Sequence, residues 1–312
     1  MIEWLRVLVG MGIALGLVLT GFGWLAQFWP ALDLVNNALP AFAAGSVVLF
    51  LLALITRHWR SIALAGLLAA INVGLIFAGL HGAAAEAAPG AKRFLRVVTF
   101  NLRFDNDRID GIDKFLSQTD ADVVVLQEAT KEHLGLLHQG LDSRYPYSVG
   151  EFSVAIFSKY AIKVDGRVDR PGYPDWIGLL ARWVELDVNG TTVELVGVHL
   201  ARPFYPVLQE HDVMALTQFV LTRKLPVIVA GDFNLTPWTD QLKSFTRTTG
   251  LGRFNTFIFT WPMRRRQYPL VPVVAIDNVF ASREFAKIAT IGGARQGSDH
   301  RPIIADITLA KE

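Results

Sequence analysis

Cysteine is absent from the 312 residues of this chain. Its absence excludes disulfide bonds, a disulfide-linked partner and thiolate metal sites, and it fits either side of a membrane. A clear excess of charge of one sign is also lacking, because 30 lysines and arginines face 28 aspartates and glutamates. After position 90 the balance stays even, with 27 of the basic and 25 of the acidic residues. A strong general nucleic-acid binder would carry a larger basic excess, since phosphate neutralisation provides its non-specific affinity.

Charged side chains are scarce in the first eighty positions, which raise the mean hydropathy of the whole chain to +0.34. Apolar runs occupy residues 4–29, 41–55 and 62–80. The first and third have the roughly 20 residues that a bilayer-spanning helix needs, and the second has them only with Pro40 and its flanks. A cleaved signal peptide fits the long first run poorly, and a buried helical domain is the other alternative. We predict a transmembrane region of three helices over residues 1–80.

The short connections between the apolar runs predict how the helices are oriented. Two arginines lie in the link 56–60 and Arg6 lies near the N-terminus, whereas the link 31–39 has one aspartate and no basic residue. Basic residues mark cytoplasmic connections, so an odd number of crossings places everything after residue 80 outside the cytoplasm. Three basic residues within 92–96 argue in the opposite direction. We expect a multi-pass protein of the inner (cell) membrane with its larger, C-terminal part extracytoplasmic.

Residues 81–93 are rich in small side chains and contain a Pro-Gly turn, so we interpret them as a linker. Residues 94–312 then form a second domain of about 220 residues, enough for a sizeable core. Strand patterns alternate there with helical patterns such as 207–223, and Asn189-Gly190 predicts a hairpin between two strands. Mixed strands with interspersed helices predict an α/β domain in which two packed sheets are flanked by helices.

The most informative stretch is residues 227–238, Val-Ile-Val-Ala-Gly-Asp-Phe-Asn-Leu-Thr-Pro-Trp. Its four apolar residues predict a buried strand, and Gly231 allows a tight backbone turn. Asp232 and Asn234 then lie at the carboxyl end of the strand, where layered α/β proteins usually keep their chemistry. An ordinary Asp/Asn turn explains the stretch as well, unless similar polar groups follow other strands.

Similar polar groups do follow other strands. Asn101, Glu128 and His199 each end a predicted strand, Asp277 lies within an apolar run, and Gly-Ser-Asp-His at 297–300 opens the last strand. In this order the motifs resemble the endonuclease/exonuclease/phosphatase superfamily, which includes DNase I-like nucleases, abasic-site endonucleases, neutral sphingomyelinases and inositol-polyphosphate phosphatases. The resemblance extends from about residue 95 to the C-terminus, and it implies a four-layer α/β sandwich.

Glu128 is the best candidate for a metal ligand. A carboxylate after four apolar residues is costly unless it is paired or bound to a cation, and hard oxygen ligands suit Mg²⁺ or Mn²⁺. The alternative is an acid that caps a helix near Thr130. The resemblance adds Asn101 and Asp299 to the metal and phosphate side of the site.

The resemblance also implies a set of catalytic residues. It pairs Asp277 with His300 as an acid-oriented imidazole, of the kind used in general acid-base steps. Asp232 and Asn234 resemble the pair that activates water or orients the phosphate, and His199 resembles a second histidine of the family. Whether His300 or Asp232 takes the proton stays open, because coupled acids and histidines titrate as a group.

Two departures from the abasic-site endonucleases indicate the branch of the superfamily. Those enzymes carry an acid two positions after the asparagine of the first strand, where this chain has Arg103. They also lack a histidine at the position of His199. The motifs are therefore more similar to those of DNase I and the sphingomyelinases, and a role in DNA repair is not expected.

Basic and aromatic residues form a third group of candidates, for binding the substrate. Guanidinium groups and aromatic rings can hold a polyanion or a lipid headgroup by charge and by stacking. The alternative is a solvated loop whose aromatic rings pack on the core. The predicted substrate-binding residues are Arg103, Arg202, Trp261, Arg264, Arg265 and Arg266.

Together these features predict a membrane-anchored phosphoester hydrolase that depends on a divalent cation and acts on a phosphodiester substrate. A nuclease is the favoured activity, because it is the commonest one in the superfamily. A phosphodiesterase or phosphatase acting on phospholipid or inositol-phosphate headgroups is the alternative, favoured by the membrane helices and the weak net charge. A catalytically inactive binding module is disfavoured, since the set of polar motifs is complete.

Overall fold

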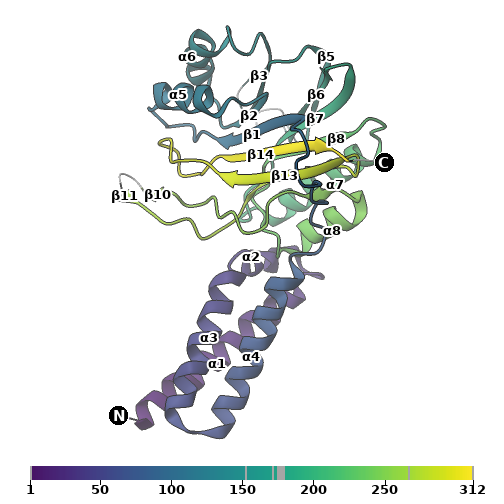
Figure 1. Cartoon of the computed structure of the whole chain (residues 1–312). Helices are drawn as coiled ribbons and strands as arrows, with labels where there is room; N and C mark the ends of the chain where they lie inside the picture. The colour runs from purple at the N-terminus through teal and green to yellow at the C-terminus, as the bar shows by residue number, and fades with distance from the viewer. Residues whose placement is uncertain (1, 152, 171, 174–179, 266–267, 311–312) are drawn as a thin grey trace.

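Three long apolar helices precede a compact body of sheets and helices in the computed structural model (Figure 1). The structure describes residues 2–151, 153–170, 172–173, 180–265 and 268–310. The helices are α1 (Ile2–Leu25), α3 (Leu39–Thr56) and α4 (Trp59–Ala78), with mean hydropathies of 2.0, 2.3 and 2.2 in their most apolar windows. At most 28% of each window is buried, so most apolar side chains face outward, as a lipid environment requires. Each helix is long and apolar enough to cross a membrane, as predicted.

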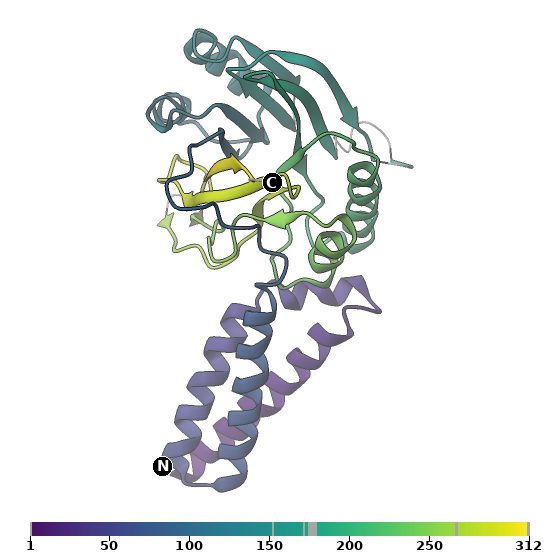
Figure 2. The same ribbon diagram turned by 45° about the vertical axis from the view of Figure 1, so that its right-hand side comes forward.

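The two ends of this helical bundle differ in what they contact. At the end far from the body, Arg6 Nη2 donates to the Thr56 carbonyl, so the start of α1 lies beside the turn between α3 and α4. At the near end, the link between α1 and α3 lies against the body (Figure 2). The link contains a 3₁₀ turn (Pro30–Leu32) and the short helix α2 (Asp33–Asn36), neither of which the sequence predicted.

Two six-stranded sheets form the body. The neighbouring pairs β1/β2 and β7/β8 are parallel, and the other pairs within these sheets are antiparallel. The first sheet has the order β13 (Phe285–Gly292), β14 (Ile303–Leu309), β1 (Leu95–Asn101), β2 (Val123–Gln127), β4 (Val154–Ser158), β3 (Tyr147–Glu151). The second has the order β5 (Ile162–Val168), β6 (Ala181–Val188), β7 (Thr191–His199), β8 (Val227–Asp232), β12 (Asp277–Ala281), β9 (Gly252–Arg253).

The apolar faces of the two sheets pack against each other and form the central core, with side chains such as Val97, Val125 and Ile228 fully buried. Helices α5 (Ile109–Thr119) and α6 (Lys131–Leu141) cover the outer face of the first sheet. Helices α7 (Pro206–Leu221) and α8 (Asp240–Thr249) cover the outer face of the second (Figure 2). The predicted four-layer α/β sandwich is therefore confirmed.

Several elements lacked a clear signal in the sequence. The edge strand β5 is mostly exposed and contains no apolar run, and α8 is polar apart from a narrow apolar face that includes Leu242 and Phe245. The predicted hairpin at Asn189-Gly190 is present, with positive φ angles of 53° and 86° that suit these two residue types.

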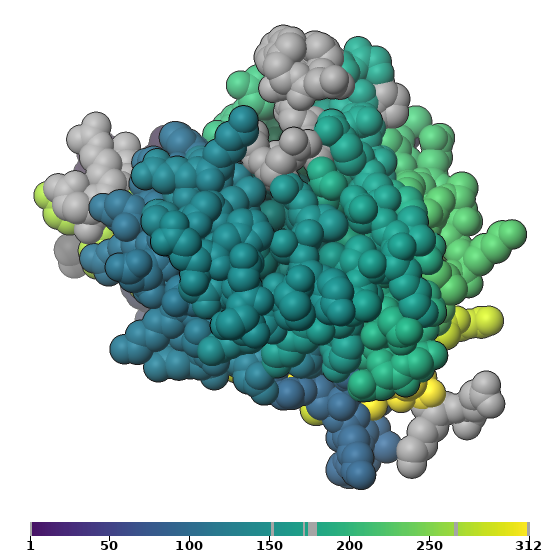
Figure 3. All heavy atoms as spheres, turned by 90° about the horizontal axis from the view of Figure 1, so that it is seen from above, coloured from purple at the N-terminus to yellow at the C-terminus, as the bar shows by residue number. Residues whose placement is uncertain are grey.

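The segment 81–93 is bonded to the body along much of its length. The N–H of Ala84 donates to the Arg253 carbonyl, and the N–H of Ala87 donates to the Lys287 carbonyl, both at 2.8 Å. The segment thus continues from α4 as extended chain held by backbone hydrogen bonds. The blue and teal parts of the chain, from β1 to β7, form most of the face turned away from the bundle (Figure 3).

Candidate active site

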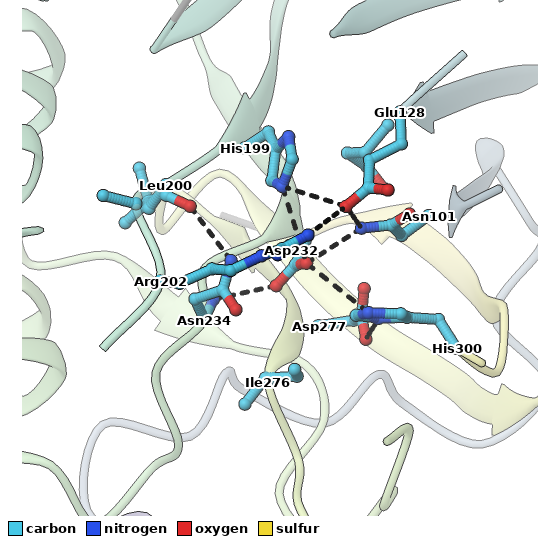
Figure 4. Close-up of polar contacts among 12 residues, drawn as sticks. Asn101, Glu128, His199, Leu200, Arg202, Asp232, Asn234, Ile276, Asp277 and His300 are labelled. Atoms are coloured by element: carbon cyan, nitrogen blue, oxygen red, sulfur yellow. Dashed lines mark hydrogen bonds and ion pairs between the residues drawn. The ribbon is translucent and has the colours of Figure 1, made fainter. Parts of the chain in front are cut away.

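The parallel strand pairs bring the predicted polar residues together. Asn101 pairs in register with Gln127, the residue before Glu128, and His199 pairs with Asp232. The antiparallel neighbour β12 then places Asp277 opposite Asp232. All of these strands end or begin at one edge of the sandwich, so their terminal side chains converge (Figure 4).

The prediction of a tight turn at Gly231 is wrong. Gly231 instead allows two strands to approach each other closely. It lies inside β8 and pairs with Val198 of the neighbouring strand. A Cβ atom at Gly231 would lie 2.0 Å from the Val198 carbonyl oxygen. Glycine therefore allows β7 and β8 to approach closely just before their catalytic candidates, His199 and Asp232.

Glu128 lies just past β2 with a positive φ of 54° and points into the cluster. Its carboxylate accepts hydrogen bonds from Asn101 Nδ2 at 3.3 Å, the Phe104 N–H at 3.2 Å and Arg202 Nη2 at 3.3 Å. Burial alone would raise the pKa of Glu128, but His199 and these donors lower it. The capping alternative is excluded, because Thr130 itself caps α6.

His199 lies between two carboxylates. Its Nε2 atom is 3.8 Å from Glu128 Oε1 and 3.9 Å from Asp232 Oδ2. Burial lowers the pKa of His199 to about 4 against the opposing effect of Glu128. A neutral imidazole at this point can accept or donate a hydrogen bond without adding charge.

Asp277 and His300 form the predicted pair. His300 Nδ1 lies 2.9 Å from Asp277 Oδ2, and its Nε2 lies 3.8 Å from Asp232 Oδ2. Burial disfavours the charged ring, but Asp277 and Asp232 outweigh burial and raise the pKa of His300 to about 10. Burial and the neighbouring Asp277 raise the pKa of Asp232 to about 7. The other oxygen of Asp277 is buried and has no hydrogen-bond partner among the described residues.

Asn234 and Asp232 form a tight loop after β8. The Asn234 N–H donates to Asp232 Oδ1 at 2.8 Å, and its side-chain amide donates to the Leu200 carbonyl at 3.0 Å. Asp232 Oδ2 also accepts from Asn101 Nδ2 at 3.0 Å. Asp232 is therefore the centre of the network that Figure 4 shows, with contacts to both sheets.

The donor set of the cluster fits a divalent cation. Oxygen atoms of Glu128, Asp232 and Asp277 converge at strand ends, and Mg²⁺ and Mn²⁺ prefer carboxylate and amide oxygens. Asp232, Asp277 and His300 also offer ligand atoms within 4.8 Å of one another. The unpartnered oxygen of Asp277 is a further sign that the cluster accommodates a group besides these side chains.

Asp299 lies at the edge of this cluster. Its carboxylate accepts a hydrogen bond from Trp261 Nε1 at 3.3 Å and lies 4.0 Å from Arg103 Nη1. Within the described residues, no hydrogen bond joins Asp299 to Glu128 or Asn101. The structure thus groups Asp299 with the predicted substrate-binding residues.

Part of the cluster lines a pocket of about 860 Å³, and His199 lines a neighbouring pocket that shares Glu128 with it. The cluster residues of the larger pocket are Glu128, Asp232, Asn234, Asp299 and His300. Three of the predicted arginines, Arg103, Arg202 and Arg264, line it together with Trp261. The backbone of Arg265 lies in the two-residue strand β10 (Arg264–Arg265), which pairs with β11 (Tyr268–Pro269), and Arg266 lies outside the described residues. Arg103 and Arg264 both contact Asp105, whose charge offsets part of theirs.

One wall of the pocket was missed by the sequence analysis. Leu34, Asn37 and Ala38, from the link between α1 and α3, line it together with residues of the polar cluster. Asn37 Oδ1 accepts a hydrogen bond from the Thr236 N–H at 3.0 Å, so the link is attached to the loop that follows Asp232. No local pattern marked these residues, because Asn37 and its partner Thr236 are 199 positions apart along the chain.

A buried ion pair that supports His199 was also missed. Arg170 Nε lies 2.8 Å from Asp212 Oδ1, and Arg170 also donates to the His199 carbonyl at 3.0 Å. Asp212 in turn accepts from the Ala201 N–H at 2.7 Å. The pair fixes the backbone on both sides of Leu200, and a lone arginine and a helical aspartate carry no sequence signal for such a role.

A sequence profile described as the Endonuclease/Exonuclease/phosphatase family matches residues 98–300, which include the whole cluster. The chain belongs to this family. No curated protein sequence matches closely enough to count as a relative. The fold agrees with that of solved structures, of which 136 match.

Three of these structures show the range of the similarity. An endonuclease/exonuclease/phosphatase from Bacteroides vulgatus is 20% identical, with a TM-score of 0.57 over 69% of this chain and 99% of that one. A mannosyl-6-phosphatase from Bacteroides thetaiotaomicron is 18% identical, with a TM-score of 0.56 over 69% and 100%. A beta toxin from Staphylococcus aureus with bound magnesium ions is 19% identical, with a TM-score of 0.54 over 68% and 99%. At these identities the similarity establishes the fold, and the family membership indicates a phosphoester hydrolase.

Proposed function

We propose that this protein is a membrane-anchored, divalent-metal-dependent hydrolase that cleaves a phosphoester in the headgroup of a membrane lipid. One observation carries the proposal: the pocket that Glu128, Asp232 and His300 line is also lined by Leu34, Asn37 and Ala38. These three residues connect α1 to α3, two candidate membrane spans. The pocket therefore opens where the spans end, at the level of the lipid headgroups.

The pocket also has apolar side chains that suit this position. Phe104, Phe204 and Leu270 line it and are 58%, 74% and 41% exposed. Aromatic side chains are favoured at the interface between membrane and water, where one end is apolar and the other wet. A pocket lined by both apolar and charged side chains suits a substrate that has a phosphate and a hydrocarbon part.

Glu128 and Asp232 are the proposed holders of the cation, with the unpartnered oxygen of Asp277 as a further donor. Asn101 donates its amide N–H groups to both Glu128 and Asp232 and so positions them. A bound Mg²⁺ or Mn²⁺ supplies a Lewis acid that polarises the phosphoryl oxygens. Its charge would also ease the crowding of carboxylates that raises the pKa of Asp232. Removal of the cation with a chelator should abolish turnover, and added Mg²⁺ or Mn²⁺ should restore it.

The remaining roles follow from the contacts. His300 is held by Asp277 with its Nε2 toward Asp232, which suits proton transfer to or from a water or leaving oxygen. His199 and Asn234 lie on the other side of Asp232 and suit hydrogen bonds to the phosphate. The proton acceptor stays open between Asp232 and His300, which titrate together.

For the membrane orientation, we propose the arrangement that places the C-terminal body outside the cytoplasm. The basic link 56–60 and Arg6 lie together at the end of the bundle far from the body, which supports a cytoplasmic location for that end. Two of the three opposing basic residues near the body lie beside acids: Arg96 Nε lies 2.6 Å from Asp306 Oδ1, and Arg93 Nε lies 3.9 Å from Asp122 Oδ2.

A nuclease is the second candidate, because Arg103, Arg202 and Arg264 line the pocket. A long polyanion would contact several of them at once. Each lost phosphate contact would reduce the number of counterions released on binding, and with it the slope of log K against log salt concentration, by about one. Arg202, however, pairs with Glu128, while Arg103 and Arg264 contact Asp105. This compensation, and the wall formed by the link, favour a small headgroup over a polymer.

The test uses the full chain in lipid nanodiscs with Mg²⁺ and offers phosphatidylglycerol, phosphatidylcholine, phosphatidic acid, single-stranded DNA and RNA. We expect hydrolysis of at least one phospholipid and none of the nucleic acids. Glu128→Gln provides the matched inactive control. Hydrolysis of nucleic acid alone, with a steep salt dependence that flattens in Arg264→Gln, would establish the nuclease instead. A protein that hydrolyses none of these substrates but binds one would be the inactive binding module.

A further inference from the structure

An apolar groove of about 490 Å³ lies where the helical bundle meets the body. All of its lining side chains are apolar apart from the indole N–H of one tryptophan. They are Pro40, Ala43, Ala44 and Val47 of α3, Val73, Ile76 and Phe77 of α4, and Trp238, Phe257 and Phe259 of the body. The groove is distinct from the catalytic pocket and shares no lining residue with it.

The body side of the groove is bonded to the end of α4 and consists of packed aromatic rings. Trp238 is fully buried and its Nε1 donates to the Ile76 carbonyl at 3.2 Å, which fastens the body to the end of α4. The Trp238 ring lies 6.4 Å from Phe259 in a stacked arrangement and 6.3 Å from Phe257. Because the indole N–H is already bonded, these rings present only apolar surface to the groove.

The groove and the catalytic pocket are lined by neighbouring residues of the same two segments. Around the start of α3, Ala38 lines the pocket and Pro40 lines the groove. In the body, Phe259 lines the groove and Trp261 lines the pocket, and the intervening Thr260 donates its N–H to the Val274 carbonyl. The two cavities are therefore separated by only one residue along each of these segments.

We propose that the groove holds an acyl chain of the lipid whose headgroup phosphate enters the catalytic pocket. The inference rests on the proposed lipid substrate. α3 and α4 are candidate spans, so the side of the groove that they form would border bilayer hydrocarbon, and the absence of polar lining excludes a headgroup. An apolar void of about 150 Å³ already binds benzene, so a groove of about 490 Å³ is large enough for a length of acyl chain.

This arrangement gives the membrane helices a part in substrate selection. A lipid whose chain fills the groove gains apolar burial that a short-chain or water-soluble phosphodiester lacks. This additional apolar burial should raise kcat/KM, and the increase should depend on the length of the acyl chain. The chemistry at the polar cluster is the same for both kinds of substrate.

The test fills the groove by substitution. Ala44→Trp introduces an indole at an exposed groove-lining position of α3, and Ala41→Trp introduces the same group at an exposed position of α3 outside both cavities. Full-length variants are compared in nanodiscs on dioleoyl and dihexanoyl forms of the hydrolysed phospholipid, and on soluble bis(4-nitrophenyl) phosphate. Val73→Trp, from the α4 wall, provides an independent second variant.

We expect Ala44→Trp and Val73→Trp to lower kcat/KM for the dioleoyl lipid at least tenfold, with the dihexanoyl lipid and the soluble diester changed less than twofold. Ala41→Trp should resemble wild type on all three. Equal activity of all variants on the dioleoyl lipid overturns the proposal that the groove binds an acyl chain. The proposed lipid substrate would be unaffected by that result. Parallel losses on the soluble diester also overturn it, because they indicate damage to the active site. If wild type hydrolyses the soluble diester and no phospholipid, the proposed function itself is wrong.

Discussion

Three carboxylates and two imidazole rings form a continuous series of contacts at the strand ends, from Glu128 through His199, Asp232 and His300 to Asp277. Such a concentration of buried charge is costly without compensation. The two histidines of the cluster have pKa values that are shifted in opposite directions. The pKa of His199 falls to about 4, and that of His300 rises to about 10. A divalent cation next to the carboxylates is the simplest compensation.

At the residue scale, we predict that Glu128→Gln lowers kcat by about two to three orders of magnitude, as expected when a group that acts on the transition-state charge is lost. The substitution removes one formal charge from the proposed cation site and barely changes side-chain size. Turnover is measured across a Mg²⁺ titration, with Glu132→Gln as the control, because Glu132 is exposed on the first turn of α6. Turnover near that of wild type at saturating Mg²⁺ would refute the assignment of Glu128.

At the element scale, two features shape the candidate active site and the pocket beside it. The first is the close approach of β7 and β8 at Gly231, which carries no side chain between the strands. The second is α2, a helix of four residues that is too short to be stable alone. Asp33 and Asn36 are buried there and hydrogen-bonded to each other at 2.8 Å, so α2 exists because of its packing against the body.

Gly231→Ala should destabilise the fold by about 2–3 kcal/mol, because the new methyl group has to displace the Val198 carbonyl from 2.0 Å. Thermal unfolding measures the change. Gly135→Ala is the control: its Cβ would meet nothing within 4 Å in the middle of α6, so it should stabilise by about 0.5–1 kcal/mol. Equal melting temperatures for the two variants would contradict the proposed role of the close approach.

Asp33→Ala should loosen the link from the body. The Asp33 carboxylate accepts from the N–H groups of Asp240 and Gln241 at 2.8 and 3.0 Å, as a capping residue would. Loss of such a cap costs about 1–2 kcal/mol. We expect faster cleavage of the link in limited proteolysis and lower activity on phospholipid.

The matched control for this variant is Asp110→Ala, an exposed acid in the first turn of α5 that is remote from the link. Proteolysis of the link at the wild-type rate in Asp33→Ala would show that the two hydrogen bonds do not hold it.

At the scale of the whole molecule, the bundle is arranged so that its basic end and its catalytic end are opposite. Three helices that could cross a membrane connect these ends, so the side of the membrane that the body would occupy determines which substrates it would meet. Outside the cytoplasm these are the lipids of the outer leaflet. In the cytoplasm they would include soluble nucleotides and RNA.

An alkaline phosphatase fused to the C-terminus should be active in a bacterial host, and a fluorescent protein fused there should be dark. Fusions inserted at the α3–α4 turn, near Arg57, should show the reverse pattern and serve as the control. An active phosphatase at the turn combined with an inactive one at the C-terminus would place the body in the cytoplasm.

The sequence by itself determined the features that have a local signature. Long apolar runs predicted three helices, and buried strands with interspersed helices predicted two packed sheets. The polar ends of those strands predicted Asn101, Glu128, His199 and Asp232 as site residues, whereas the role of Asp277 came from the resemblance to the family. These signals are local because burial on both faces requires a continuous apolar run, and the polar residue that ends the run is its neighbour in the chain.

Only the tertiary structure decided which distant residues meet. The wall formed by Leu34 and Ala38 and the support of His199 by Arg170 and Asp212 join segments that no periodicity connects. Asp299 has a carboxylate of the expected type, but its contact with Trp261 depends on how two loops approach each other. Such pairings depend on the packing of the whole molecule, because a side chain's partners in three dimensions leave no regular spacing along the chain.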